Sequence, residues 1–378
     1  MKFTLKHYNT PLMTFSATMD TSDPELDILW HDPERTSLLP LDLELTPESL
    51  SRWLRRRTIP KNRAYVHALL AKYGLNLNRP MGILAACKGL SLNDCYWVAG
   101  EGDTSDFTKI NLYENRFSRV LAALAFTGYG SGARASLRSS PEFTTNGMLP
   151  KCWRRVGGKI LLFKAGTEGT SNAGFEPYSE FYAAQVAEAM DINAIFYGLS
   201  KWKGRLCSTC ELFTSIERAF LPVGNLVTKG GMPAVSAYYA QLGPEFVSSL
   251  HGMLVFDAVI CNVDRHFGNF GFLIDNKTNQ ISAPAPLFDH GNSLFSFAGT
   301  DCWENSEALD DYIATLVPSV YDDFIGTAKA VMGAEHRKML RNLLTFQFRK
   351  HPAYNLPVKR RKLIEKQIQK RARLLLEV

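Results

Sequence analysis

Hydrophobic and polar residues alternate over about the first 28 positions, in the runs KFTLKHYN and LMTFSATM. Successive side chains of a strand point to opposite faces, so this pattern predicts short strands or a small hairpin. The spacing then becomes helical. Thr46 is a candidate N-cap followed by a proline, and the apolar residues Leu50, Trp53 and Leu54 fall on one face. The pattern predicts a helix over about residues 47–57.

Two more helices are expected in the N-terminal part, NRAYVHALLAKYGL, which ends near Gly74, and RPMGILAACKGL. Short helices joined by tight turns can form a DNA-reading helix-turn-helix, and the preceding RWLRRR carries positive charge. Such helical hairpins are more often packing units, and no diagnostic turn identifies a DNA-binding motif here. Both interpretations stay open.

A stretch rich in Gly, Ser, Thr and Pro, TGYGSGARASLRSSPEFTTNGMLPK at residues 127–151, predicts a linker or a functional loop. After it, CWRRVGGKILLFKAG has two strand patterns around a turn at Gly157 and Gly158, and GFEPYSEFYAAQVAEAMDI has a helical pattern. Strands are again expected from AIFYGL to GRLCSTCELF, and mostly helices from about Met232. The order is glycine-bearing loop, strand, helix.

The apolar run MLVFDAVICNVDRHFGNFGFLID is interrupted by four polar residues, Asp264, Arg265, His266 and Asn269. A helix is expected to end near Ile260, before the break, and an apolar strand to follow it. The break therefore predicts a loop held between two buried elements. From about Ser306 to Val378 helical patterns predominate, and we find no internal repeat.

The 378-residue chain is 46% hydrophobic and 21% charged, as globular proteins are, so the polar break does not belong to a disordered region. The length suggests two or three structural units. The net charge of +6 comes mostly from VKRRKLIEKQIQKRARLLLEV at the C-terminus. We expect an amphipathic helix there, with a packed Leu and Ile face and solvated Lys and Arg; contact with nucleic acid, anionic lipid or an acidic partner is the alternative.

Seven scattered cysteines, an odd number, indicate free thiols of a reducing compartment. Cys207 and Cys210 form one CxxC, but no second CxxC or neighbouring His pair completes a zinc site, so ordinary strand cysteines are favoured. The first residues lack a long apolar region, and no stretch reaches the roughly 18 apolar residues of a membrane span. We expect a cytoplasmic protein without a membrane span.

The polar break has the chemistry of a metal site. Asp264 and Asn269 stand five positions apart in the loop, and APLFDHGNSLF places Asp289 just after another apolar run, in a second rigidly supported loop. Two carboxylates and an amide oxygen suit a magnesium ion that also keeps water and phosphate ligands. A site completed by phosphate oxygens implies a nucleotide, and phosphoryl transfer needs a further carboxylate to orient the attacking hydroxyl.

An Asp followed five positions later by Asn, and then by a downstream Asp-X-Gly, is the catalytic-loop and metal-loop pattern of the protein-kinase-like fold. VDRHFGNFGF resembles most closely the HipA-like serine/threonine kinases of bacterial toxin-antitoxin systems. It is also similar to the Asp-Arg-His-x-x-Asn of phosphatidylinositol kinases. The resemblance implies Asp264 as the catalytic base, His266 as a loop-organising residue of the catalytic group, and Asn269 and Asp289 as magnesium ligands.

The resemblance implies further site residues upstream. Lys164 of KILLFKAG would pair with the nucleotide phosphates, and Glu180 of the following helix would hold that lysine, with Glu188 as the alternative. FTTNGMLPKCW resembles the short phosphate loop of HipA-like kinases. It contains Gly147, Pro150 and Lys151, but not the several glycines of ordinary protein kinases. A connecting strand would present backbone groups to adenine, with the candidates Glu211, Leu212 and Phe213.

In HipA-like kinases a hydroxyl residue three places before the loop glycine can be autophosphorylated. Thr144 occupies that position in this chain. The nearby alternatives are Thr145, Ser139 and Ser140.

The resemblance thus implies an α+β, two-lobed protein-kinase-like fold with a helical C-terminal lobe and an additional N-terminal subdomain. We expect the subdomain at residues 1–130, the N-lobe at 131–225, and the C-lobe with its basic terminal helix at 226–378. HipA-like proteins carry a strand-rich N-terminal subdomain. The helical segment around Trp53 does not match that pattern.

The implied function is ATP- and Mg²⁺-dependent phosphorylation of a serine or threonine in a protein substrate, by a toxin or regulatory kinase with an antitoxin partner. Three alternatives remain: a phosphatidylinositol-type lipid kinase, a pseudokinase that acts as a binding module, and a nucleic-acid-binding regulator. The regulator would use RWLRRR and the basic terminal helix.

Overall fold

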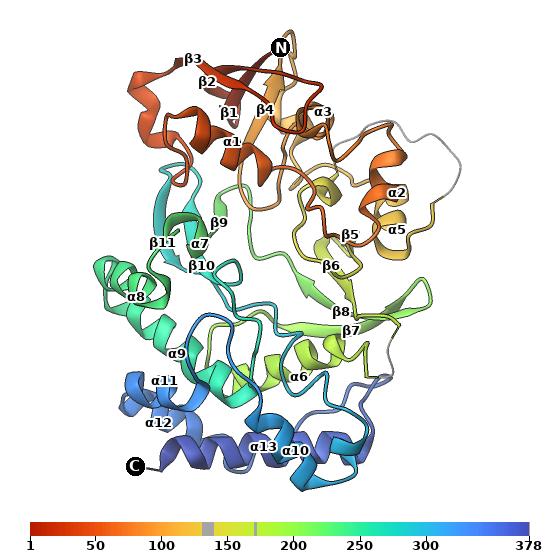
Figure 1. Ribbon diagram of the computed structural model, residues 1–378, viewed down its shortest axis with the longest axis vertical. Coiled ribbons are helices and arrows are strands. Elements are labelled where there is room, and N and C mark those ends of the chain that lie inside the picture. The colour runs from red at the N-terminus through yellow and green to blue at the C-terminus, as the bar shows by residue number, and fades with distance from the viewer. Residues whose placement is uncertain (131–139, 170–171, 378) are drawn as a thin grey trace. The chain divides into compact units, whose positions relative to one another are not determined.

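The computed structural model describes residues 1–130, 140–169 and 172–377, and its chain packs as two compact units (Figure 1). The first unit comprises Met1–Lys164, Thr214–Leu221 and Leu273–Ser282. The second comprises Ala165–Phe213, Pro222–Phe272 and Ala283–Val378. Each unit is therefore assembled from segments that are distant in the sequence.

The first unit begins with an antiparallel sheet in the order β3-β2-β1-β4. Its strands are β1 (Lys2–His7), β2 (Thr10–Ala17), β3 (Leu26–His31) and β4 (Tyr96–Gly100). The hairpin expected within the first 28 residues is confirmed as β1 and β2, whose buried residues alternate with more exposed ones. The third and fourth strands were not predicted.

The first unit also contains short helices, some of which contact this sheet (Figure 1). They are η1 (Pro33–Leu38), α1 (Pro47–Arg55), α2 (Val66–Ala71), α3 (Pro80–Cys87), α4 (Phe107–Ile110), α5 (Arg119–Thr127) and η2 (Pro141–Phe143). The predicted N-cap of α1 is confirmed, because Thr46 Oγ1 accepts the backbone N–H of Ser49 at 3.2 Å. Trp53 and Leu54 of α1 are buried in one hydrophobic core with Phe3 and Phe15 of the sheet. The N-terminal region is therefore both strand-rich and helical.

Two later segments of the chain complete the first unit. They belong to a sheet in the order β11-β10-β9, formed by β9 (Arg218–Pro222), β10 (Gly271–Asp275) and β11 (Gln280–Pro284). The Asn279 side chain donates to the carbonyl oxygen of Leu39 at 2.6 Å, and the Tyr8 hydroxyl donates to that of Ile216 at 2.6 Å. These bonds attach both segments to the N-terminal region.

The first unit also contains the predicted strand pair around Gly157 and Gly158. It is confirmed as the antiparallel hairpin of β5 (Lys151–Val156) and β6 (Lys159–Ala165). Both turn glycines have positive φ, at 58° and 82°, which favours glycine at these positions.

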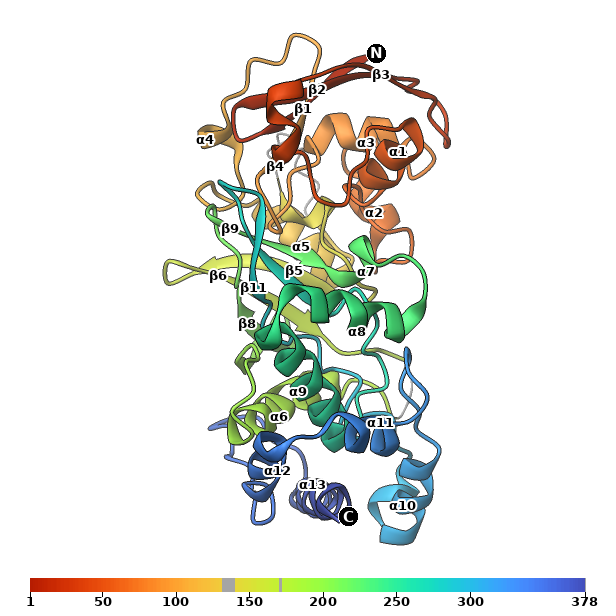
Figure 2. The ribbon, with the colours of Figure 1, turned by 90° about the vertical axis from the view of Figure 1, so that its left-hand side faces the viewer.

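The second unit is mostly helical (Figure 2). Its hairpin of β7 (Tyr197–Trp202) and β8 (Arg205–Glu211) contacts α6 (Glu176–Ala189). The other helices are α7 (Val223–Leu226), α8 (Gly231–Leu242), α9 (Pro244–Ile260), η3 (Asp301–Trp303), α10 (Ser306–Ala314), α11 (Phe324–Val331), α12 (Ala334–Arg341) and α13 (Val358–Leu376). The last turns of α9 are buried on all sides, and α9 contacts α6, α8, α11 and α13. This buried helix leads directly into the polar break.

The basic terminal helix is α13, and it differs from the expectation. Ile364, Ile368 and Leu375 are buried as predicted, whereas Leu374 is exposed. Arg360, Arg361 and Arg371 are buried as well. The Arg360 guanidinium lies between the rings of Phe175 and Trp303, with centroids 3.8 and 4.0 Å away. The prediction of solvated arginines was therefore wrong for these three, because their guanidinium groups contact neighbouring elements or other buried groups.

All seven cysteines are buried. Cys207 and Cys210 both lie on β8. Within the described ranges, no helix combines the length and the hydropathy that crossing a membrane requires.

Candidate functional site

The polar break forms a tight loop after α9. Cys261 ends the helix in the left-handed conformation, with φ at 50°. Asp264 is partly exposed, and its Oδ2 accepts a hydrogen bond from the Asn292 side chain at 2.8 Å. Asn269 is buried and donates from its amide to the carbonyl oxygen of Asp264 at 3.1 Å. The loop therefore brings Asp264 and Asn269 together, as the sequence predicted.

Arg265 joins this loop to the second one. Its side chain is fully buried, and it forms a two-pronged ion pair with Asp257 of α9 at 2.9 and 3.0 Å. Its Nη1 donates to the carbonyl oxygens of Phe288 at 2.7 Å and Asn269 at 3.3 Å. Burial raises the pKa of the Asp257 carboxyl, and the charge of Arg265 opposes that rise. One guanidinium thus fixes the backbones that carry the candidate metal ligands.

The second loop holds Asp289 in a strained backbone conformation. Its φ is 59°, in the left-handed region, and its N–H donates to the Tyr197 hydroxyl oxygen at 3.0 Å. The next residue, His290, is fully buried, and its Nδ1 lies 3.1 Å from Arg265 Nη2. The N–H of Val263 donates to the carbonyl oxygen of Asn292 at 3.1 Å. The two loops are therefore bonded to each other through both backbone and side chains.

His266 has a local role in the first loop. Its exposed ring accepts the backbone N–H of Gly268 on Nδ1 at 3.1 Å. Its own N–H donates to the carbonyl oxygen of Asp264 at 2.9 Å, and its carbonyl oxygen accepts the N–H of Asn269 at 2.9 Å. His266 therefore bonds to three residues of its own loop, and its loop-organising role stays a prediction.

The donor set fits magnesium. Asn269 and Asp289 supply oxygen atoms from two loops that Arg265 ties together. Among the described residues no group of three or more His, Cys, Asp or Glu side chains could hold a metal alone. A metal here would therefore take its remaining ligands from water and phosphate, as expected for Mg²⁺ bound with a nucleotide.

Glu180 is buried on α6, and Ser208 of β8 donates to its Oε2. Burial raises the pKa of the Tyr197 phenol well above its usual value, and the charges of Glu180 and Asp289 add to this effect. Glu188, the alternative glutamate, is exposed and forms an ion pair with Arg349. The two candidate glutamates thus occupy different environments.

The candidate connecting strand follows β8. Glu211 is exposed, and the Phe213 ring lies 5.6 Å from that of Phe288, next to Asp289. The chain passes from the second unit to the first directly after Phe213. These residues therefore end the first segment of the second unit.

The candidate phosphate loop lies in the first unit. Gly147 has φ at 93°, and a Cβ there would clash with Lys151 Nζ. This Nζ is held under the loop, where it donates to the carbonyl oxygen of Asn146 at 2.9 Å. The left-handed backbone conformation favours glycine at this position, whereas the flexible end of the lysine could move away from a Cβ.

Arg63 clamps this loop from the N-terminal helical region. Its side chain is fully buried and pairs with Glu142 at 2.5 Å. The guanidinium also donates to the carbonyl oxygens of Glu142, of Thr145 at 3.1 Å and of Lys151 at 3.1 Å. Glu142 in turn accepts the N–H of Trp153 at 2.9 Å. A residue of the N-terminal region therefore fixes the shape of the loop.

Lys164 is buried on β6, directly opposite Lys151 on β5. Residues opposite each other in an antiparallel pair point to the same face of the sheet. Two buried lysines of like charge therefore share one face of the hairpin.

Each candidate autophosphorylation residue in the described part of the chain forms a hydrogen bond through its hydroxyl group. Thr144 is buried, and its hydroxyl donates to the carbonyl oxygen of Leu90 at 2.8 Å. The Thr145 hydroxyl donates to that of Pro141 at 2.7 Å, and Ser140 is buried at the N-cap of η2. Ser139 lies outside the described residues.

Several site residues were missed by sequence reasoning. Asn292 could have been suspected, because it stands three residues after Asp289 in the same motif. Tyr197, Arg63 and Glu142 carry no local signal, since their partners lie far away in the chain.

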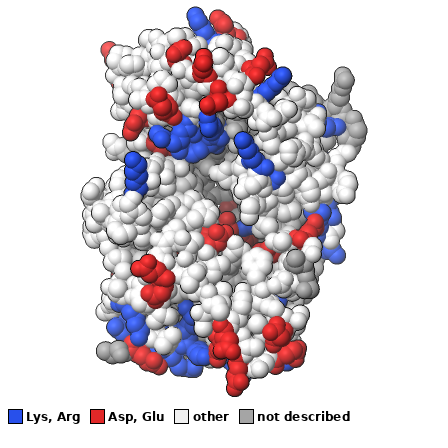
Figure 3. Space-filling model, in the orientation of Figure 1, with Lys and Arg blue, Asp and Glu red and all other residues white. Residues whose placement is uncertain are grey.

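Three of the four arginines of RWLRRR form ion pairs with carboxylates of the first unit. Arg57 is buried and pairs with Asp94 at 2.7 Å, while its guanidinium stacks on Trp53 at 4.3 Å. Arg55 and Arg56 also pair with carboxylates. Figure 3 shows blue and red side chains mixed over the region where Figure 1 draws α1. The positive charge expected for nucleic-acid binding is thus largely neutralised in place.

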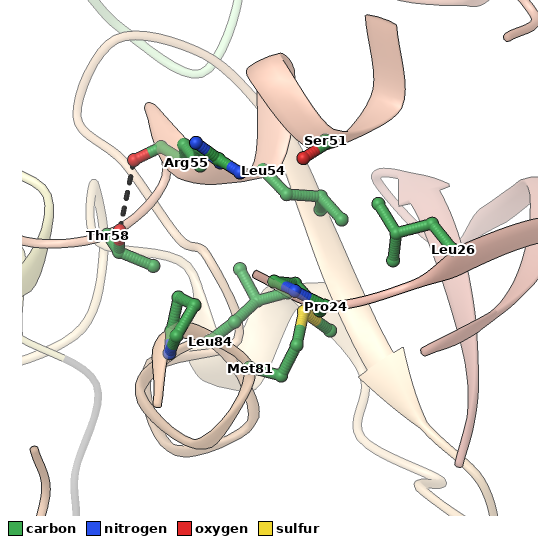
Figure 4. A pocket seen from close by; sticks show the side chains of 9 residues that line it. Pro24, Leu26, Ser51, Leu54, Arg55, Thr58, Met81 and Leu84 are labelled. Carbon is green, nitrogen blue, oxygen red and sulfur yellow. Dashed lines mark hydrogen bonds between the residues drawn. The ribbon is translucent and has the colours of Figure 1, made fainter. Parts of the chain in front are cut away.

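Two hollows flank α1. One is a gap of ≈ 10 Å³ between α1, β3 and α3, lined mainly by apolar side chains such as Leu54 and Met81 (Figure 4). It has room for about one water molecule, so it is a packing defect and not a ligand site. The other is an open groove of ≈ 620 Å³ lined by Arg52, Arg55, Arg56 and neighbouring acidic residues.

The fold of the chain is similar to that of solved structures of known proteins. No protein-family model and no curated protein matches the chain. Among solved structures, it is similar to the Helicobacter pylori proinflammatory kinase CtkA, with 15% identity and a TM-score of 0.49 over 61% of this chain and 90% of that chain. It is also similar to HipA of Shewanella oneidensis MR-1, solved in complex with HipB and its operator DNA, with 11% identity and a TM-score of 0.54 over 98% of this chain and 96% of that chain. The chain therefore has the α+β, kinase-like fold of HipA.

Proposed function

We propose that the chain is an ATP- and Mg²⁺-dependent protein kinase that phosphorylates a serine or threonine hydroxyl. The observation that carries this proposal is the pair of bonded loops around Arg265. These loops hold Asp264, Asn269 and Asp289, the base and ligand types that phosphoryl transfer requires. The HipA fold supports the same function by analogy.

Asp264 would accept the proton of the attacking hydroxyl. The Asn292 amide holds one of its oxygens, and the side chain remains partly exposed, where a substrate hydroxyl can approach. Asn269 and Asp289 would hold Mg²⁺, which neutralises phosphate charge when bound. The backbone of Glu211 and Phe213 would contact adenine.

Lys151 and Lys164 would bind the phosphates of the nucleotide. They are buried and lie opposite each other on one face of the β5–β6 hairpin, so both ammonium groups belong to the same side of the sheet. Glu180 would orient Lys164. Gly147 lets the loop backbone approach the phosphates, and Thr144 would be the site of autophosphorylation once the loop opens.

We also propose a protein partner of the antitoxin type. The similar HipA structure was solved with HipB and operator DNA. Contact of this chain with DNA would then be indirect, because three arginines of RWLRRR already pair with its own carboxylates.

Labelled ATP tests the proposal. The purified protein is incubated with γ-labelled ATP, Mg²⁺ and either a protein extract or phosphoinositide vesicles. We expect label on protein serine or threonine, and none with the Asp289→Ala variant. Label on lipid alone would establish the lipid-kinase alternative, and no label in either arm would favour the pseudokinase. Phosphoproteomics of cells that express wild type or Asp289→Ala would then identify the substrate.

A further inference from the structure

Tyr197 stands at the start of β7, outside every motif that identified the site. Its phenol is buried, and the hydroxyl oxygen accepts the N–H of Asp289 at 3.0 Å. Its ring packs edge-on against His290, with the centroids 6.0 Å apart and the ring planes at 69°. Tyr197 thus contacts two consecutive residues of the second loop, residues 288–292, which is the candidate metal loop.

The conformation of Asp289 makes this bond important. A non-glycine residue with φ at 59° is strained and persists only where its surroundings hold it. Without the Tyr197 oxygen, the Asp289 N–H would lose this acceptor at a partly buried site, where the loss of a hydrogen bond is unfavourable. Both effects would favour a backbone shift that moves the Asp289 carboxylate.

Tyr197 also connects the metal loop to other parts of the site. The charge of Glu180 on α6 acts on the phenol, and Ser208 of β8 donates to Glu180. On the other side, His290 contacts Arg265, which fixes the loop of Asp264. Tyr197 is therefore linked to Glu180 through charge, to the loop of Asp289 by direct contact, and to the loop of Asp264 through His290 and Arg265.

We propose that Tyr197 is a positioning residue that holds Asp289 in its metal-binding conformation through the phenol oxygen. This inference rests on the proposed kinase function and adds to it a residue from outside the kinase motifs. Tyr197 does not bind the metal itself. It acts on metal affinity through the backbone of Asp289.

The test compares Tyr197→Phe with Tyr182→Phe. Both variants remove one hydroxyl from a buried tyrosine of the second unit; that of Tyr182 donates to Asn355 at 3.3 Å, away from the loops. The first measurement is hydrogen exchange at the Asp289 amide in ligand-free protein. We expect slow exchange in the wild type and at least about tenfold faster exchange in Tyr197→Phe only, a factor that corresponds to about 1.4 kcal/mol for the lost hydrogen bond.

The second measurement is the Mg²⁺ concentration that half-saturates phosphoryl transfer. We expect it to rise about tenfold in Tyr197→Phe, as for other residues that support metal ligands, while the rate at saturating Mg²⁺ stays within about twofold. Tyr182→Phe should match the wild type in both measurements.

Fast exchange of Asp289 in the wild type would overturn the proposal even if the variant did not fold. Unchanged exchange in folded Tyr197→Phe, or an unchanged Mg²⁺ requirement in an active enzyme, would also overturn it. If the wild type transfers no phosphate, the kinase function fails on its own, and the exchange result still shows whether Tyr197 holds Asp289.

Discussion

The side-chain nitrogen of Asn292 lies 2.8 Å from Oδ2 of Asp264, so a residue of the metal loop fixes the candidate catalytic base. The backbones of the same two loops are joined between Val263 and Asn292 at 3.1 Å. The orientation of the base therefore depends on the placement of the metal loop. This coupling is expected where the base and the metal ligands must act on one phosphoryl group.

Asn292→Ala should slow phosphoryl transfer by about tenfold, less than the 10²–10⁴-fold attributed to a general base itself. The reason is that Asp264 would remain present but lose its orienting bond. The rate at saturating ATP is the measurement. Asn292→Asp should be worse, because a second carboxylate would repel Asp264. A rate for Asn292→Ala equal to wild type would contradict the orienting role.

Asp257→Asn should destabilise the second unit by about 3–5 kcal/mol, since it leaves Arg265 buried without its counter-charge. The free energy of unfolding in denaturant measures this effect. Asp310→Asn is a matched control that breaks a more exposed pair with Lys370, and it should cost at most about 1 kcal/mol. Equal losses in the two variants would argue against Arg265 as the anchor of the loops.

Arg63→Lys should raise the KM for ATP by about tenfold and leave kcat nearly unchanged. A lysine cannot reproduce the fork that holds Glu142 and three carbonyl oxygens, and each lost bond to a buried group costs about 1–3 kcal/mol. Steady-state kinetics and limited proteolysis of the loop are the measurements. Arg79→Lys, at an exposed ion pair with Asp20, serves as the control. If kcat fell and KM did not change, the clamp would not act on nucleotide binding.

His7 should make the first unit sensitive to acid. Burial lowers the pKa of His7 from 6.5 to about 4, although Asp94 opposes the shift. Between these values the unfolded chain takes up a proton and the folded chain does not, so stability falls as the pH drops from about 6.5 to 4. At pH 4.5 the loss is about 2.5 kcal/mol.

His7→Phe keeps an aromatic ring against Tyr96 and removes this titration. Its melting temperature should therefore fall less than that of wild type between pH 7 and 4.5. Identical pH profiles for the two proteins would show that His7 does not carry the effect.

Local signals in the sequence predicted the elements that local chemistry determines. Thr46 identified the start of α1, and the glycine pair identified the β5–β6 turn. The polar break between apolar runs identified the loop of Asp264, because few other arrangements place charged residues between buried elements. The joint order of the kinase motifs then indicated the fold.

Contacts between residues far apart in the chain could not be predicted from local sequence patterns. β4 pairs with β1 from about 90 residues away, and β3 has no regular alternation of buried and exposed residues. The partners of Arg63 lie 79 or more positions downstream. The buried arginines of α13 depend on rings such as Trp303. These relations arise only when the chain folds.

The most direct test of the kinase proposal compares wild type with Asp264→Asn in the Mg²⁺-dependent transfer of phosphate from γ-labelled ATP to protein. ADP affinity and melting temperature are measured for both as controls. We expect the variant to bind ADP as wild type does and to transfer phosphate at least about a hundredfold more slowly. Equal transfer rates in the two proteins, or a wild type that neither binds ADP nor transfers phosphate, would contradict phosphoryl transfer by this site.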